Sequence, residues 1–239
     1  MKILFLKYLF LITLFIFFNS CENESVALTS PDKKVKLEII IKEGKPYYQV
    51  KQEGKTMVDK SELGFTLHNN EPCKGVLFGN INYQFSKKGD ECIWGTGNTY
   101  NQIVIGLEEK GDTKRKFDIV FRVFNNGYQF RYEFPIQNNL KEFIIADEST
   151  EFNLPKEYAL ADNPDTINNS FIFKTDGGAY YTISELEIDN YPAMRLTGKD
   201  ETSVYKIDLT SKSKQKQLLL KAPGITPWRV VLFPDTMPE

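Results

Sequence analysis

The chain has 239 residues, with 30 Lys and Arg against 32 Asp and Glu, one His and three Cys. Its 41% hydrophobic and 26% charged residues are typical of a globular protein and exclude wholesale disorder. The net charge of −2 and the scattered Lys and Arg give no basic surface, so we exclude nucleic acid as a partner. The single histidine, His68, excludes multi-histidine zinc sites and most hydrolytic triads.

Residues 1–20 have the layout of a secretory signal. Lys2 and Lys7 precede an apolar run over 8–18, which is too short to cross a hydrocarbon core that needs about 20 residues. Ser20 stands directly before Cys21, and a polar tether over 21–27 follows, as at a bacterial lipoprotein processing site. We predict export and acylation of Cys21, with the protein lipid-anchored in the periplasm or at the outer membrane and cell surface. An ordinary cleaved signal with a stray cysteine is the alternative.

The mature chain alternates apolar and polar residues with a period of two. Val35, Leu37 and Ile39 alternate with charged residues, and similar short runs recur to the end of the chain between Gly, Pro, Asn and Asp. No strong amphipathic helix and no linker interrupts them. The pattern predicts one all-β domain over 28–239, built as a large antiparallel β-sandwich.

Two cysteines remain after acylation. Cys73 and Cys92 both stand beside turn-like residues, and outside the cytoplasm neighbouring strands could bring them into one disulfide. Two separately buried thiols are the alternative.

The segment 93–101 is rich in Gly and Asn and contains candidate carbohydrate-binding residues. Trp94 and Tyr100 offer aromatic surfaces for a sugar ring, and Asn98 and Asn101 offer amide hydrogen bonds. Packing of the tryptophan under a loop is the alternative.

Residues 117–134 predict a hairpin with its turn at Asn126-Gly127. That turn places Val123 opposite Phe130 and Arg122 opposite Arg131, with the apolar side chains together on one face. The two arginines indicate an ion network that is solvated or faces another domain, and an anion site is the alternative.

Other polar candidates are weaker. Glu185 and Glu187 lie two apart on a predicted strand and so share a face, as an acid pair or as a polar sheet face that contacts another domain. His68 lies in a polar turn, where a mutarotase-like reaction would have to rest on it alone. Asp162 and Asp165 stand on an Asn/Pro-containing loop, which indicates a solvated turn rather than a metal site.

Several segments, in this order, resemble the N-terminal domain of glycoside hydrolase family 97. They are LTSPD (28–32), SELGF (61–65), FRVFNNGYQFRYEFP (121–135), YPAMRL (191–196) and PWRVV (227–231). The resemblance implies an exported Bacteroidetes protein with a β-sandwich akin to the galactose-mutarotase fold. It also implies a following catalytic (β/α)8 barrel that acts on α-glucosides or α-galactosides.

Two departures from that family shape the expected function. The chain ends at Glu239, before the barrel whose carboxylates cleave the glycosidic bond, and a sandwich truncated at this end is one interpretation of the sequence. The family places a calcium-binding glutamate after Lys156-Glu157-Tyr158, but residues 159–169 contain none, so we expect no metal and no cofactor.

The leading hypothesis is a non-catalytic accessory or carbohydrate-binding module that recognises α-linked oligosaccharides. The alternatives are a mutarotase-like sugar epimerase and an interaction module that docks a separate catalytic domain.

Overall fold

The computed structural model describes residues 24–68, 78–93, 96–109, 112–161, 170–187, 191–199, 202–209 and 218–233. Within these ranges the chain forms antiparallel strands and no helix, which confirms the all-β prediction. The described residues accordingly contain no helix with the length and apolarity needed to cross a membrane.

One layer is a seven-stranded sheet in the order β1-β2-β3-β4-β11-β16-β15. In β2 the alternation read from the sequence holds, because Val35, Leu37, Ile39 and Ile41 are buried. Its strands are β1 (Glu24–Thr29), β2 (Val35–Lys42), β3 (Lys45–Gln52), β4 (Lys55–Glu62), β11 (Glu151–Asn153), β16 (Val204–Asp208) and β15 (Arg195–Lys199).

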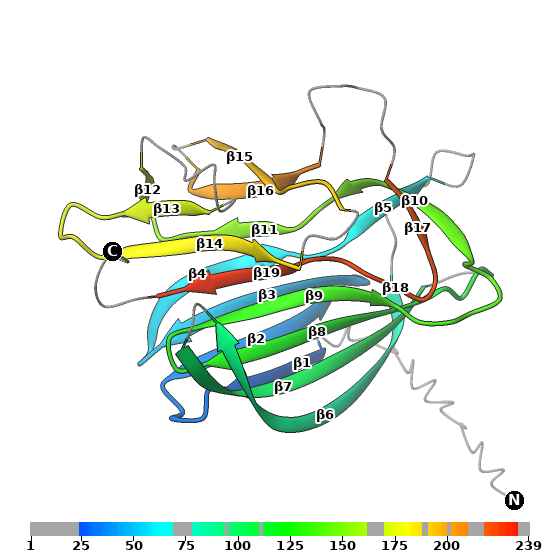
Figure 1. Cartoon of the computed structure of the whole chain (residues 1–239), viewed down its shortest axis with the longest axis horizontal. Helices are drawn as coiled ribbons and strands as arrows, with labels where there is room; N and C mark the ends of the chain where they lie inside the picture. Colours follow the sequence, from blue (N-terminus) through cyan, green and yellow to red (C-terminus); the bar gives the residue numbers. More distant parts are fainter. Residues whose placement is uncertain are drawn as a thin grey trace, which may run out of the picture.

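The second layer is a nine-stranded sheet in the order β12-β13-β14-β19-β9-β8-β7-β6, with β18 also paired to β9. Figure 1 shows its green strands β8 and β9 in front of the blue strands β1 and β2. Its strands are β12 (Ala159–Leu160), β13 (Phe171–Lys174), β14 (Tyr180–Leu186), β19 (Trp228–Leu232), β9 (Gly127–Phe134), β8 (Lys116–Phe124), β7 (Thr96–Glu109), β6 (Phe78–Ile93) and β18 (Gly224–Ile225).

A small third sheet closes one end of the sandwich. It runs in the order β17-β10-β5, from β17 (Leu218–Lys221) through β10 (Glu142–Glu148) to β5 (Phe65–His68). Phe65 packs edge-on against Phe117 and Tyr132 of the nine-stranded sheet, at ring-centroid distances of 5.0 and 5.4 Å.

Aromatic side chains hold the two large sheets together. The ring of Tyr48 on β3 lies 5.7 Å from Tyr128 and 5.6 Å from Phe130, both on β9. The Tyr48 hydroxyl accepts a hydrogen bond from Tyr128 and donates one to the carbonyl of Glu151. These polar atoms are therefore satisfied inside an otherwise apolar layer.

The β8–β9 hairpin exists, but its predicted register is wrong. Phe124 pairs with Gly127, so the two turn residues are Asn125 and Asn126. Arg122 consequently faces Gln129, and Arg131 faces Val120. A shift of two residues keeps every side chain on its predicted face and only separates the two arginines along the strands.

The glycine next to the turn meets a neighbouring strand. A Cβ atom on Gly127 would lie 2.2 Å from the carbonyl oxygen of Val231, because β19 pairs with this end of β9. Gly127 is thus required by the neighbouring strand and not by a turn conformation.

Candidate functional site

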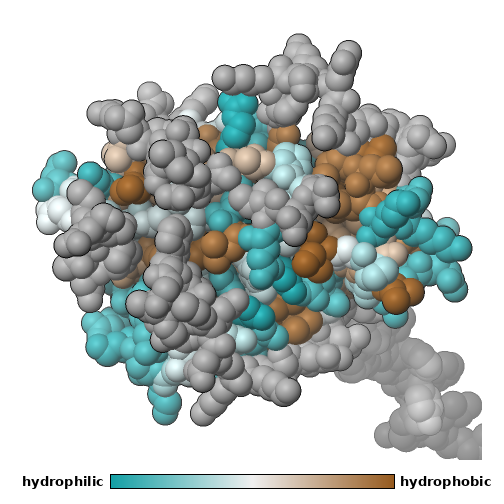
Figure 2. All heavy atoms as spheres, in the orientation of Figure 1, coloured by the Kyte–Doolittle hydropathy of each residue, from teal (hydrophilic) through white to brown (hydrophobic). Residues whose placement is uncertain are grey.

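The outer face of the nine-stranded sheet, directed away from the sandwich core, is built around Trp228. The guanidinium carbons of Arg122 and Arg131 each lie 4.4 Å from its ring centroid, which leaves the indole 1% exposed. Such contacts are cation–π interactions. Figure 2 shows this face, where hydrophilic and hydrophobic side chains alternate over the central strands.

Arg122 is fixed by further contacts. Its guanidinium also lies 4.7 Å from the ring centroid of Tyr100, and its Nε donates a hydrogen bond of 2.7 Å to Gln102 on β7. Tyr100 in turn packs edge-on against Phe124, at 5.4 Å. The outer face therefore presents an ordered aromatic and cationic surface.

Arg131 carries an ion network at the same face. It forms salt bridges of 2.7 Å to Glu133 and 3.2 Å to Glu187. The Arg131 side chain is 19% exposed, and those of Glu133 and Glu187 are 31% and 57% exposed, so this network meets solvent. Burial and the nearby charge of Glu133 raise the pKa of Asp118 on the adjacent strand.

A row of hydroxyl groups on β14 completes the outer face. Tyr180, Thr182 and Ser184 alternate along the strand and share the face of Leu186, which pairs with Trp228. All three side chains are buried, and among the residues that the structure describes their hydroxyl oxygens have no hydrogen-bond partner. A buried hydroxyl without a partner costs about 1–3 kcal/mol, which bound water relieves.

The inner face of the same sheet holds a buried arginine cluster. Arg229 on β19 forms salt bridges to Glu148, at 2.7 Å, and to Glu185. Tyr191 donates to Glu148, and the backbone N–H of Met194 donates to Glu185. Burial raises the pKa of Glu185 although Arg229 opposes the shift, while the two carboxylates hold the Arg229 guanidinium charged despite its burial.

The family-specific sequence model for the glycosyl-hydrolase 97 N-terminal domain matches residues 28–168 and 159–239. Together these segments cover most of the chain. The chain belongs to this family.

Solved enzymes share the fold of this family 97 domain. A β-arabinopyranosidase is 21% identical with a TM-score of 0.70, and the match covers 88% of this chain and 40% of that one. A family 97 enzyme from Pseudoalteromonas sp. strain K8 matches with a TM-score of 0.72 in its complexes with panose, at 22% identity, and with acarbose, at 23% identity. The latter two matches cover 88% of this chain and 36% of the enzyme, so the chain spans well under half the length of these relatives.

The residues predicted to bind carbohydrate divide between two faces of β7. Tyr100 lies on the outer face beneath Arg122, whereas the Asn101 side chain donates a hydrogen bond of 2.8 Å to the Thr29 carbonyl on the facing sheet. Asn98 lies on β7, but its side chain is outside the described residues. Trp94 is wholly outside them. Carbohydrate binding by this set stays a prediction.

The remaining cysteine and metal predictions are not tested. Cys21, Cys73, Asp162 and Asp165 lie outside the described residues, and Cys92 lies on β6 with its side chain outside them. In the part of the chain that the structure describes, no three His, Cys, Asp or Glu residues are grouped as metal ligands.

Glu185 and Glu187 do not share a face. β14 ends at Leu186, and Glu187 has a left-handed backbone with φ of 60°. Glu185 therefore points inward to Arg229, while Glu187 reaches Arg131 on the outer face. The acid-pair interpretation is wrong because the strand ends between the two residues.

Sequence reasoning missed the β14 hydroxyl row and the Arg229 cluster. The signal for the row was present, because β14 places Tyr180, Thr182 and Ser184 at alternate positions. No local signal marks Glu148 as the partner of Arg229, since the two residues are 81 positions apart.

Proposed function

We propose that this family 97 domain is a non-catalytic accessory module of a glycoside hydrolase. The observation that carries the proposal is that the buried carboxylates Glu148 and Glu185 both bind the guanidinium of Arg229. Glycoside cleavage needs two carboxyl groups that face the bond across a fixed gap. Carboxylates committed to a buried arginine cannot protonate or attack a substrate.

The module is proposed to bind α-linked oligosaccharides at the outer face of the nine-stranded sheet. A sugar ring stacks on an aromatic side chain and its hydroxyls accept hydrogen bonds from a cation. Tyr100 and Arg122, both partly exposed, supply these two groups at this face. Panose and acarbose are bound by a structural relative, which supports the class of ligand.

Calorimetric titration with panose tests the binding proposal. We expect Tyr100→Ala to weaken binding by about five- to tenfold, because it removes the partly exposed ring on which a sugar would stack. Tyr47→Ala, at a partly exposed tyrosine of β3 on the other sheet, is the matched control and should bind as the parent chain does. Absence of binding heat with panose, maltooligosaccharides and α-galactosides would refute the carbohydrate proposal.

A second candidate is docking of a separate catalytic domain. It is favoured by the half-buried network of Arg131, Glu133 and Glu187, because ordered arginines around a tryptophan are typical of protein interfaces. Size-exclusion chromatography with a purified family 97 barrel tests it. If the chain and the barrel co-elute and Arg131→Met abolishes the co-elution, docking replaces the carbohydrate proposal. If the two proteins elute separately, docking is excluded.

The mutarotase alternative is tested on the same material. Polarimetry on freshly dissolved glucose would detect a mutarotase, and release of reducing sugar from an α-linked substrate would detect a hydrolase. We expect neither signal above the uncatalysed rate. Either activity, abolished by one acidic-to-amide substitution, would overturn the accessory role.

We further propose that the chain is exported and anchored through acylated Cys21, as the signal layout indicates. Intact mass of the membrane-extracted protein should show the lipid. The Cys21→Ser variant should lose it and leave the membrane fraction.

A further inference from the structure

We propose that one end of the sandwich rests on the bilayer to which Cys21 anchors the chain. We call this end, which carries Ile136, Leu219 and Ile225, the apolar end. The proposal goes beyond the proposed accessory function, and it rests on the proposed acylation of Cys21.

The apolar end collects the large exposed hydrophobic side chains of the described residues. Ile136 is 82% exposed, Leu219 56% and Ile225 51%. Ile225 pairs with Glu133 near the end of β9, and Ile136 follows two residues after that strand ends. Figure 2 shows hydrophobic surface over β10 and β17 at this end.

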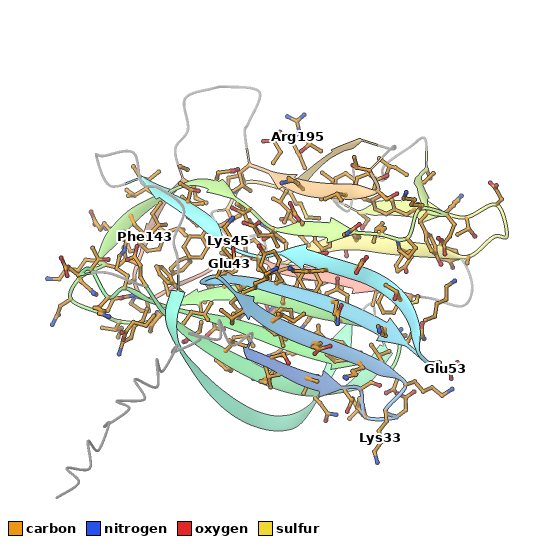
Figure 3. The ribbon with its side chains drawn as sticks, turned by 180° about the vertical axis from the view of Figure 1, so that it is seen from behind. Lys33, Glu43, Lys45, Glu53, Phe143 and Arg195 are labelled. Atoms are coloured by element: carbon orange, nitrogen blue, oxygen red, sulfur yellow. The ribbon has the colours of Figure 1, made fainter. Side chains whose placement is uncertain are left out.

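The first strand begins at the same end. β1 runs from Glu24 toward the turn that contains Lys33, and Glu24 pairs with Ile41 just before the β2–β3 turn. In Figure 3, Lys33 and Glu53 mark one end of the molecule and Phe143 marks the other, with Glu43 on the Phe143 side. Phe143 lies on β10, which pairs with the strand that carries Leu219.

The length of the tether then sets the orientation. β1 is already paired at Glu24, so only three residue steps separate it from Cys21, and these reach at most about 11 Å. Cys21 therefore stays within about one sheet-to-sheet spacing, roughly 10 Å, of the start of β1. An acyl chain on Cys21 therefore holds the start of β1, and the end of the molecule that contains it, next to the lipid.

Charge around the apolar end indicates an apolar contact and not an electrostatic one. Lys221 pairs with Glu142 at 2.9 Å, and Lys114 and Lys116 both pair with Glu108. Because both signs are present, attraction to anionic lipid headgroups is largely cancelled. Exposed isoleucine and leucine side chains instead gain by entering the boundary of the acyl chains.

Carbene footprinting of the full acylated chain in phosphatidylcholine nanodiscs tests the orientation. Relative to Cys21→Ser protein in solution, labelling of Ile136, Leu219 and Ile225 should fall at least about fivefold, as lipid contact replaces water. Labelling around Lys33 and Glu53 should not change. Equal labelling of the apolar end in both samples, or the absence of lipid on Cys21, would overturn the proposal.

A second measurement separates the apolar contact from the anchor. Flotation of a chain that begins at Glu22, without the signal and the anchor cysteine, with phosphatidylcholine vesicles should be detectable, insensitive to salt, and reduced at least about threefold by Ile225→Ser or Leu219→Ser. Lys36→Ser, at an exposed residue of β2, should float as the parent does. Equal flotation of all these variants would refute the contact. Panose binding should be unchanged in them, so the two proposals can fail separately.

Discussion

The nine-stranded sheet carries two arginine networks on opposite faces, and their surroundings differ. Arg229 on the inner face is 1% exposed and binds Glu148 and Glu185, which are equally buried. Arg131 on the outer face binds Glu133 and Glu187, both of which meet solvent. The same residue types therefore serve two purposes. The inner network is enclosed in the fold, whereas the outer network is partly exposed to solvent, where we propose that a partner contacts it.

The largest expected effect comes from breaking the inner network. Arg229→Met leaves two buried carboxylates without a cation, and we expect it to lower the free energy of unfolding by about 3–5 kcal/mol. Denaturant unfolding monitored by circular dichroism measures the loss. Arg229→Lys keeps the charge but cannot bridge both carboxylates, so it should fall between Arg229→Met and the parent. A loss below about 1 kcal/mol for Arg229→Met would remove the distinction between the two networks.

The sheet that separates the two arginine networks contains a close pairing of β9 with β19. Gly127→Ala places a methyl group against the Val231 carbonyl, and we expect it to cost about 1–3 kcal/mol through overpacking. Gly177→Ala is the matched control, because its added Cβ would meet no heavy atom closer than 3.7 Å. Equal stability of the two variants would contradict the register described for β9.

The inner network should also respond to pH through Glu185. Its pKa is raised in the fold, so the folded chain holds this proton more tightly than the unfolded chain. Its contribution to stability is therefore full below the ordinary carboxyl value of 4.5 and is lost as pH rises through the folded pKa. Glu185→Gln mimics the protonated form and should remove this dependence.

The measurement is the difference in free energy of unfolding between the parent chain and Glu185→Gln, followed from about pH 4 to about pH 8. We expect the parent to lose stability relative to the variant as pH rises across this window, because the pKa of Glu185 is raised in the fold. A difference that stays flat would contradict the raised pKa.

The smallest effect on stability is expected at the outer network. Arg131→Met removes two partly exposed ion pairs and the cation–π contact with Trp228, and should lower the free energy of unfolding by about 1 kcal/mol. The change should shrink further at high salt. A loss as large as that of Arg229→Met would show that the outer network is structural, and would weaken its assignment to a partner.

The sequence predicted the fold class and the faces of the strands because alternation with a period of two is a local property. It placed Phe121 and Phe130 correctly on the core face, but it set the hairpin register wrongly. Gly127, which the sequence suggested as a turn residue, instead pairs with β19, about a hundred residues away along the chain, and no local pattern reports that pairing.

The candidate site was less accessible to prediction. Trp228 is buried on the outer face between two arginines, and no local pattern marks that environment. The two arginines lie on β8 and β9, which the strand order of the sheet brings close to β19. Glu187 shows the same limit, since a single left-handed residue after β14 redirects its side chain to the opposite face.

The position of β1 has a practical consequence for anyone who trims this chain. The family match begins at residue 28, yet β1 begins at Glu24 and forms the border of the seven-stranded sheet. A polypeptide started at residue 28 would keep only Leu28 and Thr29 of that strand and uncover the hydrogen-bonding groups of β2. An unpaired strand edge invites edge-to-edge pairing between molecules, so we expect a chain that starts at residue 28 to aggregate more readily than one that includes Glu24.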